Sequence, residues 1–167
     1  MENELNKKVL EELIKVFSDD IKSAEESYGM LSVTVSKNKI YAIIKFLKEN
    51  SETNFNFLTD LTGIHLPENK EDLGVIYHLH NFYKNHRIRL KIFFSTQDSY
   101  VDSIVDLYSG ANWMERETFD FFGIHFKGHP NLTRILNMED MLIHPLRKEF
   151  PLEDQSRKDK NDAMFGR

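Results

Sequence analysis

The sequence predicts an α+β fold, with a mainly antiparallel sheet, helices packed on one face of it, and an extended C-terminal arm. Three observations support this. Helical and strand patterns alternate as far as Gly123, two β-rich runs over residues 74–94 are joined by a short hairpin-type loop, and sustained periodicity is lost beyond Gly123. We therefore divide the chain into an α+β domain, residues 1–123, and a partner-binding arm, residues 124–167.

The chain opens with a helix, a strand and a second helix. Apolar residues recur at three- and four-residue steps over residues 3–17, which is the pattern of an amphipathic helix. Strict alternation over residues 31–35 predicts a half-buried strand. Ser36 is then the expected N-cap of a helix over residues 37–49, whose apolar side chains form one stripe.

The middle of the chain predicts further strands. Residues 54–61 have a strand pattern that we expect to end in a turn at Thr62 and Gly63. Residues 74–82 and 86–94 form the predicted hairpin.

Alternation along the hairpin assigns its two faces. It places Ile76, His78, His80 and Phe82 opposite the side chains of Val75, Tyr77 and Leu79, and it places Arg87, Arg89 and Lys91 in water. After the hairpin, residues 103–106 resemble a capping box that would open a short helix ending near Ser109.

The segment from Trp113 to Gly123 predicts a helix that is apolar on nearly every side. One stripe comprises Trp113, Arg116, Glu117 and Asp120, whereas Glu115 falls in the apolar sector. Gly123 is a common residue just beyond a helix C-terminus. Such a helix has to be surrounded by its own domain or by a partner. We expect Arg116 to pair with Asp120 at i, i+4 spacing, and Glu115 to be buried against a cation or backbone donors of a partner.

The arm combines prolines with apolar residues that follow no helical or strand period. All but one of the four prolines lie in it, after His129, His144 and Phe150, and each disfavours helix at the residue before it. A long segment of this kind is unusual inside a compact domain, which favours an arm that packs on another protein. Its charges, which include His129, Arg134, Arg147 and Lys148, are interleaved with carboxylates, as in the polar rim of an interface.

Composition excludes several classes of function. The 167 residues carry a net charge of −5, which argues against nucleic-acid binding. There is no Cys, so disulfides, a Cys nucleophile and thiolate ligation of zinc or clusters are excluded for this chain. No apolar run approaches the ~20 residues of a transmembrane helix. The acidic N-terminus is unlike a secretory signal, so we expect a cytoplasmic protein.

The residue patterns leave two other functions open. A histidine metal site is conceivable at His78 and His80 or at His125 and His129, but the spacing does not supply helical i, i+4 geometry, and we favour histidines facing solvent or a partner. Acid–base catalysis by Glu115, Glu117 or Asp120 lacks an accompanying nucleophile or oxyanion donor, so we favour a structural role for these carboxylates.

The motifs between Ala111 and Leu152 closely resemble those of the 30 kDa-type subunit of proton-translocating NADH:quinone oxidoreductase, the bacterial respiratory complex I. They are Ala111-Asn112-Trp113, Glu115-Arg116-Glu117, Asp120, Gly123-Ile124, Gly128-His129-Pro130, Arg134-Ile135-Leu136, His144-Pro145-Leu146-Arg147-Lys148 and Phe150-Pro151-Leu152. The N-terminal half agrees in its α+β order.

The resemblance implies a non-catalytic structural subunit that supports electron transfer from NADH to quinone coupled to proton translocation. It implies no cofactor in this chain, FMN and iron–sulfur clusters in other subunits, and docking on the large quinone-site subunit and adjacent peripheral-arm subunits. The location would be peripheral, on the cytoplasmic side of the bacterial inner membrane. The alternatives are the small subunit of a related membrane-bound hydrogenase or other quinone-reducing dehydrogenase, and, less favoured, a stand-alone enzyme.

On this resemblance we assign thirteen residues to the partner interface. They are Trp113, Glu115, Arg116, Glu117, Asp120, Gly123, His129, Pro130, Arg134, His144, Pro145, Arg147 and Lys148.

Overall fold

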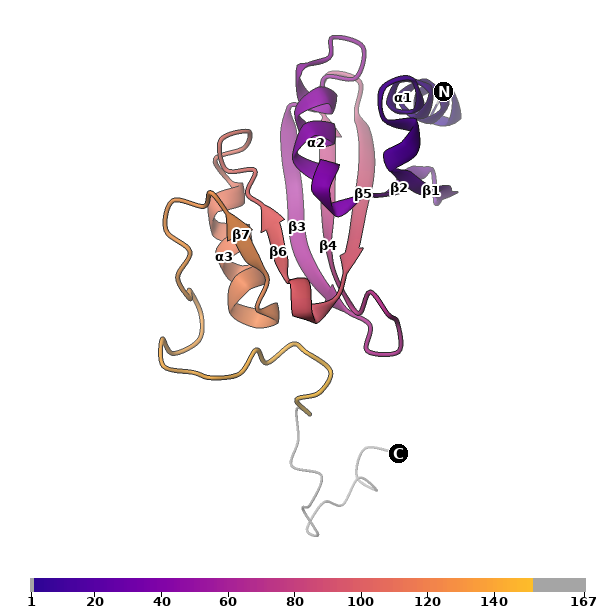
Figure 1. The fold of residues 1–167 in the computed structure, drawn as a ribbon. Coiled ribbons are helices and arrows are strands. Elements are labelled where there is room, and N and C mark those ends of the chain that lie inside the picture. Colours follow the sequence, from indigo (N-terminus) through magenta and orange to yellow (C-terminus); the bar gives the residue numbers. More distant parts are fainter. Residues whose placement is uncertain (1, 152–167) are drawn as a thin grey trace, which may run out of the picture.

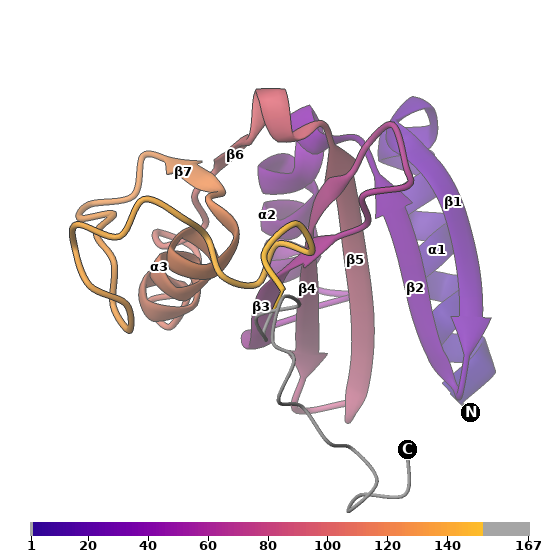
Figure 2. The same ribbon diagram turned by 90° about the horizontal axis from the view of Figure 1, so that it is seen from below.

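A computed structural model describes residues 2–151 (Figures 1 and 2). The end of the predicted arm, from Leu152 onward, lies outside the described residues. The α-helices and strands, in chain order, are α1 (Glu2–Phe17), β1 (Ile21–Ser27), β2 (Met30–Val35), α2 (Ile40–Glu49), β3 (Phe57–His65), β4 (Leu73–Asn81), β5 (His86–Phe94), β6 (Tyr100–Asp102), α3 (Ala111–Phe122) and β7 (His125–Lys127).

The main sheet has five strands in the order β1-β2-β5-β4-β3. Only the pairing of β2 with β5 is parallel, so the prediction of an α+β fold with a mainly antiparallel sheet is confirmed. The helices α1 and α2 lie on the same side of this sheet in both views (Figures 1 and 2). β6 and β7 form a separate two-stranded parallel sheet.

The core lies between the sheet and its helices. Val75, Tyr77 and Leu79 alternate along β4, and all three are fully buried, because successive strand residues point to opposite faces. The apolar stripe of α2 covers this face, and its buried residues are Ile40, Ile43, Ile44 and Leu47. Helical and strand periods thus converge on one interior, as the sequence predicts.

The turn predicted at Thr62 and Gly63 is wrong, because β3 continues through both residues to His65. Gly63 is needed here for space and not for a bend. A Cβ atom on Gly63 would lie 2.5 Å from the ring of Phe122. The lack of a side chain at Gly63 therefore allows α3 to approach β3 closely.

One predicted helix start is confirmed in position and a second is wrong. Ser36 is the N-cap residue of a 3₁₀ turn over Lys37–Lys39 that leads into α2, although its side chain makes no capping bond. The residues after Ser103 form turns instead of a helix, because the Ser103 hydroxyl bonds to the Glu115 carboxylate, which gives the side chain a tertiary role.

The sequence pattern does not predict three of the strands. β1 is an edge strand whose side chains are mostly exposed, so it lacks the apolar alternation that reveals a strand. β6 and β7 each have only three residues and depend on each other for pairing.

The arm does not leave the domain at once. Ile124, just before β7, and Phe126, within it, are buried in the main core. The following segment runs around α3 to the end of β3, seen as the orange to yellow trace in Figure 1. The division at residues 123 and 124 therefore stays a prediction, because the arm is bonded to its own domain as far as Lys148.

Candidate partner-binding site

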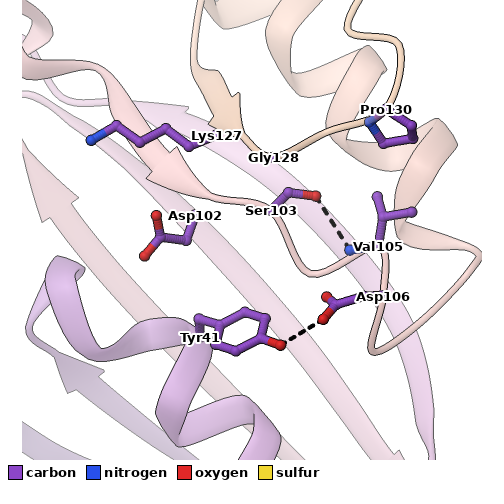
Figure 3. Close-up of a pocket in the computed structure, with 8 residues that line it drawn as sticks. All are labelled: Tyr41, Asp102, Ser103, Val105, Asp106, Lys127, Gly128 and Pro130. Carbon is purple, nitrogen blue, oxygen red and sulfur yellow. Dashed lines mark hydrogen bonds between the residues drawn. The ribbon is translucent and has the colours of Figure 1, made fainter.

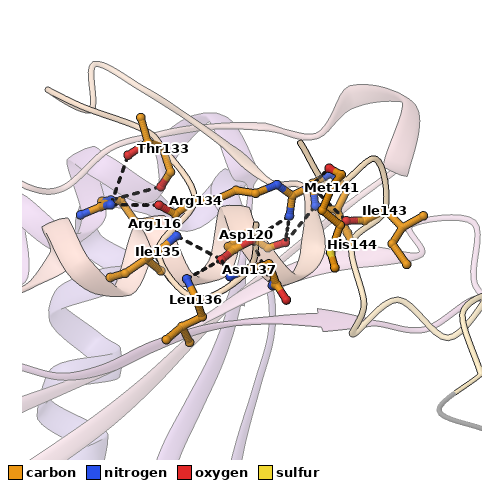
Figure 4. Close-up of polar contacts among 10 residues, drawn as sticks. All are labelled: Arg116, Asp120, Thr133, Arg134, Ile135, Leu136, Asn137, Met141, Ile143 and His144. Atoms are coloured by element: carbon orange, nitrogen blue, oxygen red, sulfur yellow. Dashed lines mark hydrogen bonds and ion pairs between the residues drawn. The ribbon is translucent and has the colours of Figure 1, made fainter. Parts of the chain in front are cut away.

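The site is built around Asp120, on the last turn of α3 (Figure 4). The Asp120 carboxylate is fully buried and receives five hydrogen bonds from the arm. The backbone N–H groups of Ile135, Leu136 and Asn137 donate to Oδ2 at 3.1, 2.8 and 2.9 Å. Arg134 Nη1 and Asn137 Nδ2 donate to Oδ1 at 2.7 and 3.1 Å. We call these five residues the Asp120 network.

Arg134 ties the network to the rest of the arm. Its Nη2 donates to the carbonyl oxygens of Met141 and Ile143 at 2.6 and 3.0 Å, and its Nη1 also donates to the carbonyl of Asp120 at 3.0 Å. A guanidinium has five donors in a fixed plane, so one side chain can fix several backbone segments at once. Arg134 thereby closes residues 134–143 into a loop against α3.

Hydrogen bonding determines the ionisation of Asp120. Burial raises the pKa of this carboxyl, but the N–H groups of Asn137 and Leu136 and the Arg134 guanidinium outweigh burial and hold the pKa well below its usual range. Asp120 is therefore ionised throughout the neutral range, and the buried charge is fully matched within the chain.

The predicted pairing of Arg116 with Asp120 is wrong. Arg116 instead donates to the Thr133 carbonyl and hydroxyl, both at 3.1 Å, and to the Arg134 carbonyl at 3.0 Å. Arg134 takes its place beside Asp120 because the arm brings a cation from fourteen residues away onto the helix. Arg116 also lies 5.2 Å from the centre of the Trp113 ring, which is largely exposed.

The C-terminal end of α3 receives the second half of the arm. Gly123 has φ +71°, and a Cβ there would lie 2.5 Å from the His144 ring. His144 Nδ1 donates to the carbonyl of Asp120 at 3.0 Å, and Arg147 Nε donates to the carbonyl of Phe122 at 2.7 Å. The Lys148 N–H donates to His65 Nδ1 at 2.9 Å. The first two contacts satisfy carbonyl groups that a helix C-terminus leaves open.

Glu115 lies apart from this network, and the prediction that a partner supplies its donors is wrong. Its carboxylate is fully buried and accepts from the Ser103 hydroxyl at 2.7 Å and from the Ile104 N–H at 2.8 Å. Burial raises the pKa of Glu115 to about 7. Glu115 therefore anchors the loop after β6 to α3 inside this chain.

A pocket of about 570 Å³ lies on the other side of Ser103, between α2, β6 and β7 (Figure 3). The hydroxyl of Tyr41 donates to Asp106 at 2.5 Å, and Ser103 is committed to Glu115. Tyr41, Asp106 and Ser103 therefore already have hydrogen-bond partners, and Glu115 is fully buried. The pocket does not support acid–base catalysis by Glu115. Glu117 is exposed on α3.

The outer surface of the arm includes large apolar side chains. The side chains of Leu136, Met138 and Leu142 are 66%, 67% and 96% exposed. Leu136 belongs to the Asp120 network, and Arg134 bonds to Met141, beside Leu142. The network thus holds large apolar side chains in water, which is unfavourable in free energy. Burial of these side chains against another protein would remove that unfavourable contribution.

The structure gathers around α3 the residues Arg116, Asp120, Gly123, Arg134, His144 and Arg147. His129 joins them through a bond from Nε2 to the Asn112 carbonyl at 3.1 Å, whereas Lys148 bonds to His65 of β3. Trp113, Glu117 and Pro130 are exposed, Pro145 is half-buried, and Glu115 faces the core. Whether these residues contact a partner stays a prediction.

Sequence reasoning misses Ser103, Asn137 and His65. The pattern assigns Ser103 to a helix cap, and nothing around Asn137 or His65 indicates a contact with distant segments. Within residues 2–151, no group of three His, Asp or Glu side chains is placed to hold a metal ion. None of the helices in that range has the length and hydropathy needed to cross a bilayer.

Comparison with known proteins extends these observations. Residues 33–156 match the profile of the family described as "Respiratory-chain NADH dehydrogenase, 30 Kd subunit". The chain is 42% identical over 147 residues to a subunit of the NADH-quinone oxidoreductase of Roseiflexus castenholzii, covering 88% of this chain and 84% of the relative. It is 38% identical over 152 residues to the corresponding subunit of Citrifermentans bemidjiense, covering 91% and 93%. For the subunit of Rhodobacter capsulatus the identity is 43%, covering 79% of this chain and 66% of the relative.

Two solved structures share the fold. The trypsin-resistant fragment of Nqo5 superposes with a TM-score of 0.66 at 27% identity, covering 79% of this chain and all of the fragment. A chain of an archaeal membrane-bound sulfane sulfur reductase superposes with a TM-score of 0.72 at 22% identity, covering 87% of this chain and 85% of that one.

Proposed function

Because this chain belongs to the family of the respiratory-chain NADH dehydrogenase 30 kDa subunit, we propose that it is a non-catalytic structural subunit of an NADH:quinone oxidoreductase. In this proposal its arm docks on the large quinone-site subunit and adjoining peripheral-arm subunits. The chain is then held at the cytoplasmic side of the bacterial inner membrane through the complex. It supports electron transfer from NADH to quinone, coupled to proton translocation, by assembling the subunits that carry it out.

The observation that carries this proposal is the exposed apolar surface of the arm. Leu136, Met138 and Leu142 project from a loop whose backbone is already held by the Asp120 network. A held loop loses less conformational entropy on binding than a free one, so more of the burial energy appears as affinity. Mixed charges around these side chains suit the polar rim of a protein interface.

The cofactors of the complex are assigned to other subunits. NADH, FMN, the iron–sulfur clusters and the quinone bind elsewhere in this proposal, and this chain binds none of them. Its sequence has no Cys to ligate a cluster.

The test replaces exposed apolar side chains of the arm by charges. Met138→Asp with Leu142→Asp is expected to leave the melting temperature of the isolated chain unchanged, because both side chains are in water. In the native host the doubly substituted chain should no longer co-purify with the large subunit from solubilised membranes. The control is Val16→Asp on α1, which is also largely exposed and lies on a different element. Normal co-purification of the arm variant would refute the docking role.

The electron donor is tested separately. Membranes from cells lacking this chain should lose NADH-dependent quinone reduction, and the wild-type gene should restore it. If the loss instead falls on hydrogen-dependent reduction, the related hydrogenase assignment replaces this one.

A further inference from the structure

The face of the sheet opposite the helices carries a second candidate surface. Within the described residues, no helix covers this face (Figures 1 and 2). Strand register places on it Phe57, Asp60 and Thr62 of β3, Ile76, His78 and His80 of β4, and Arg87, Arg89 and Lys91 of β5. The assignment of His78, His80 and the basic residues to this side agrees with the alternation of the sequence.

Three rings cluster at one end of this face. The ring of Phe82, just after β4, lies 4.8 Å from that of Phe57 and 4.7 Å from that of His80. Phe57 and Phe82 are nevertheless 43% and 57% exposed. Phenylalanine is enriched in the cores of protein interfaces, and rings that already pack on one another lose little freedom on binding.

The charges of this face are matched in pairs, with one exception among the described residues. Arg89 Nε donates to His78 Nε2 at 2.9 Å, and His78 Nδ1 lies 3.5 Å from Asp60 Oδ2. Lys91 forms an ion pair with Glu25 of β1 at 2.5 Å. Arg87 lies across the strands from His80 and is exposed, and its guanidinium has neither a hydrogen bond nor an ion pair with any described residue.

This unpaired guanidinium lies beside the aromatic cluster on a protein of net charge −5. A guanidinium binds a carboxylate or a phosphate in two parallel hydrogen bonds. An anionic lipid surface is recognised by clusters of about 4–8 Lys or Arg residues, far more than the one unpaired cation on the described part of this face. The presence of one unpaired cation, and not a cluster of them, therefore favours a polypeptide carboxylate over a membrane.

We propose that Phe57, His80, Phe82 and Arg87, the aromatic–arginine patch, dock a segment of a second polypeptide in which an acidic residue neighbours an apolar side chain. The apolar side chain covers the rings, and the carboxylate pairs with Arg87. The inference rests on the proposed function, because the second polypeptide is taken to be a neighbour in the oxidoreductase complex. The patch is distinct from the arm, so the chain binds its surroundings at two surfaces.

His78 supplies a spectroscopic signature of docking. Burial, then the charge of Arg89 and, more weakly, that of Arg87, hold the pKa of His78 below its usual value, while Asp60 acts in the opposite direction. A carboxylate paired with Arg87 offsets part of that positive field, so the pKa of His78 rises on docking. Binding elsewhere on the chain would leave this pKa unchanged.

The first experiment identifies the occupant in the assembled complex. The photoreactive residue p-benzoylphenylalanine replaces Phe82 in the full chain, expressed in the native host, and membranes are irradiated before solubilisation. The expected product joins position 82 to another subunit of the complex at a peptide containing Asp or Glu beside an apolar residue. A cross-link to a second copy of this chain, to lipid alone or to a segment without a carboxylate contradicts the proposal, as does the absence of any cross-link.

The second experiment measures how much the charge of Arg87 contributes to retention of the chain in the complex. Arg87→Glu is expected to lower the fraction of chain retained in the complex about tenfold in moderate salt. Lys45→Glu, an exposed residue on α2 with the same change of charge, is the control and should be retained like the wild type. A synthetic peptide matching the cross-linked segment should raise the pKa of His78 in the wild type but not in Arg87→Glu, as followed by NMR. Equal retention of both variants contradicts the proposal.

The two proposals fail separately. If the arm variant Met138→Asp with Leu142→Asp is lost from the complex while Arg87→Glu is retained, the docking role stands and the patch is not an interface. If the arm variant is retained, the proposed function itself is wrong. Binding of the isolated chain to phosphatidylserine vesicles, abolished by Arg87→Glu, would assign the patch to lipid and overturn the peptide assignment.

Discussion

Asp120 and Glu115 are two carboxylates on one helix with opposite environments. Both side chains are fully buried, but Asp120 accepts five hydrogen bonds, one of them from a guanidinium, whereas Glu115 accepts two from neutral donors. The pKa of Asp120 is therefore lowered, and burial raises the pKa of Glu115 to about 7. Position on the helix decides which carboxylate meets the arm and which meets the core.

Removing the charge of Asp120 should destabilise the arm. Asp120→Asn leaves the Arg134 guanidinium, which is nearly buried, without its counter-ion. We expect a loss of about 3 kcal/mol in the free energy of unfolding, measured by urea denaturation at pH 7. Amide hydrogen exchange at Leu136 and Asn137 should accelerate more than exchange in β4. Unchanged exchange at these amides would show that the Asp120 network does not hold the arm.

The raised pKa of Glu115 makes stability fall as pH rises. In the unfolded chain this carboxyl has a pKa near 4.5, and in the folded chain near 7, so the folded state binds more protons between these values. The stabilisation is complete below pH 4.5 and is lost as pH rises through 7. The variant Glu115→Gln keeps groups able to bond to Ser103 and Ile104. At pH 8 its free energy of unfolding should therefore exceed that of the wild type by about 2 kcal/mol.

The difference between the Glu115→Gln variant and the wild type should shrink as the pH is lowered from 8 to 5. The comparison is made by thermal melting of both proteins, so that other titrating groups cancel. A difference that does not depend on pH would contradict the assignment.

Among the elements, α3 packs closely on β3 on one side and is bonded to the arm on the other. Its Phe122 ring lies against the backbone of β3 at Gly63, and its C-terminal carbonyl groups accept from the arm. The helix is thus surrounded, as its nearly all-round apolar sequence requires, with its own chain covering much of it.

A methyl group at Gly63 should separate α3 from the sheet. Gly63→Ala places a Cβ atom 2.5 Å from the Phe122 ring, and we expect a loss of about 1–3 kcal/mol in the free energy of unfolding. Gly110→Ala is the matched control, because no atom lies within 4 Å of its Cβ position. Chemical denaturation of both variants provides the test, and equal stability would contradict the close approach.

For the whole molecule, the arm begins inside the core and continues on the surface. Ile124 and Phe126 are buried with the sheet residues, whereas Leu136, Met138 and Leu142 are exposed. The buried part of the segment therefore belongs to the core, and the exposed part is the one that we propose for docking.

Two truncations should separate these parts. A chain ending at Gly128 keeps β7 and its buried side chains and should remain cooperatively folded, with a reduced melting temperature from loss of the Asp120 network. A chain ending at Gly123 loses Ile124 and Phe126, each worth about 2–5 kcal/mol in a core, and should unfold or lose its cooperative transition. Calorimetry distinguishes the two, and equal stability of the truncated chains would show that β7 is not part of the core.

The sequence by itself determined the helices α1, α2 and α3, the strand β2 and the β4–β5 hairpin, because side-chain periodicity reports local geometry directly. It also indicated the family, through motifs in α3 and the arm. Only the tertiary structure decided the partners of the charged groups and the closest packing: Arg134 and not Arg116 beside Asp120, Ser103 beside Glu115, and Gly63 beneath Phe122. These contacts join residues that are distant in the chain, or depend on backbone N–H groups that nearly every residue shares, so no local pattern specifies them.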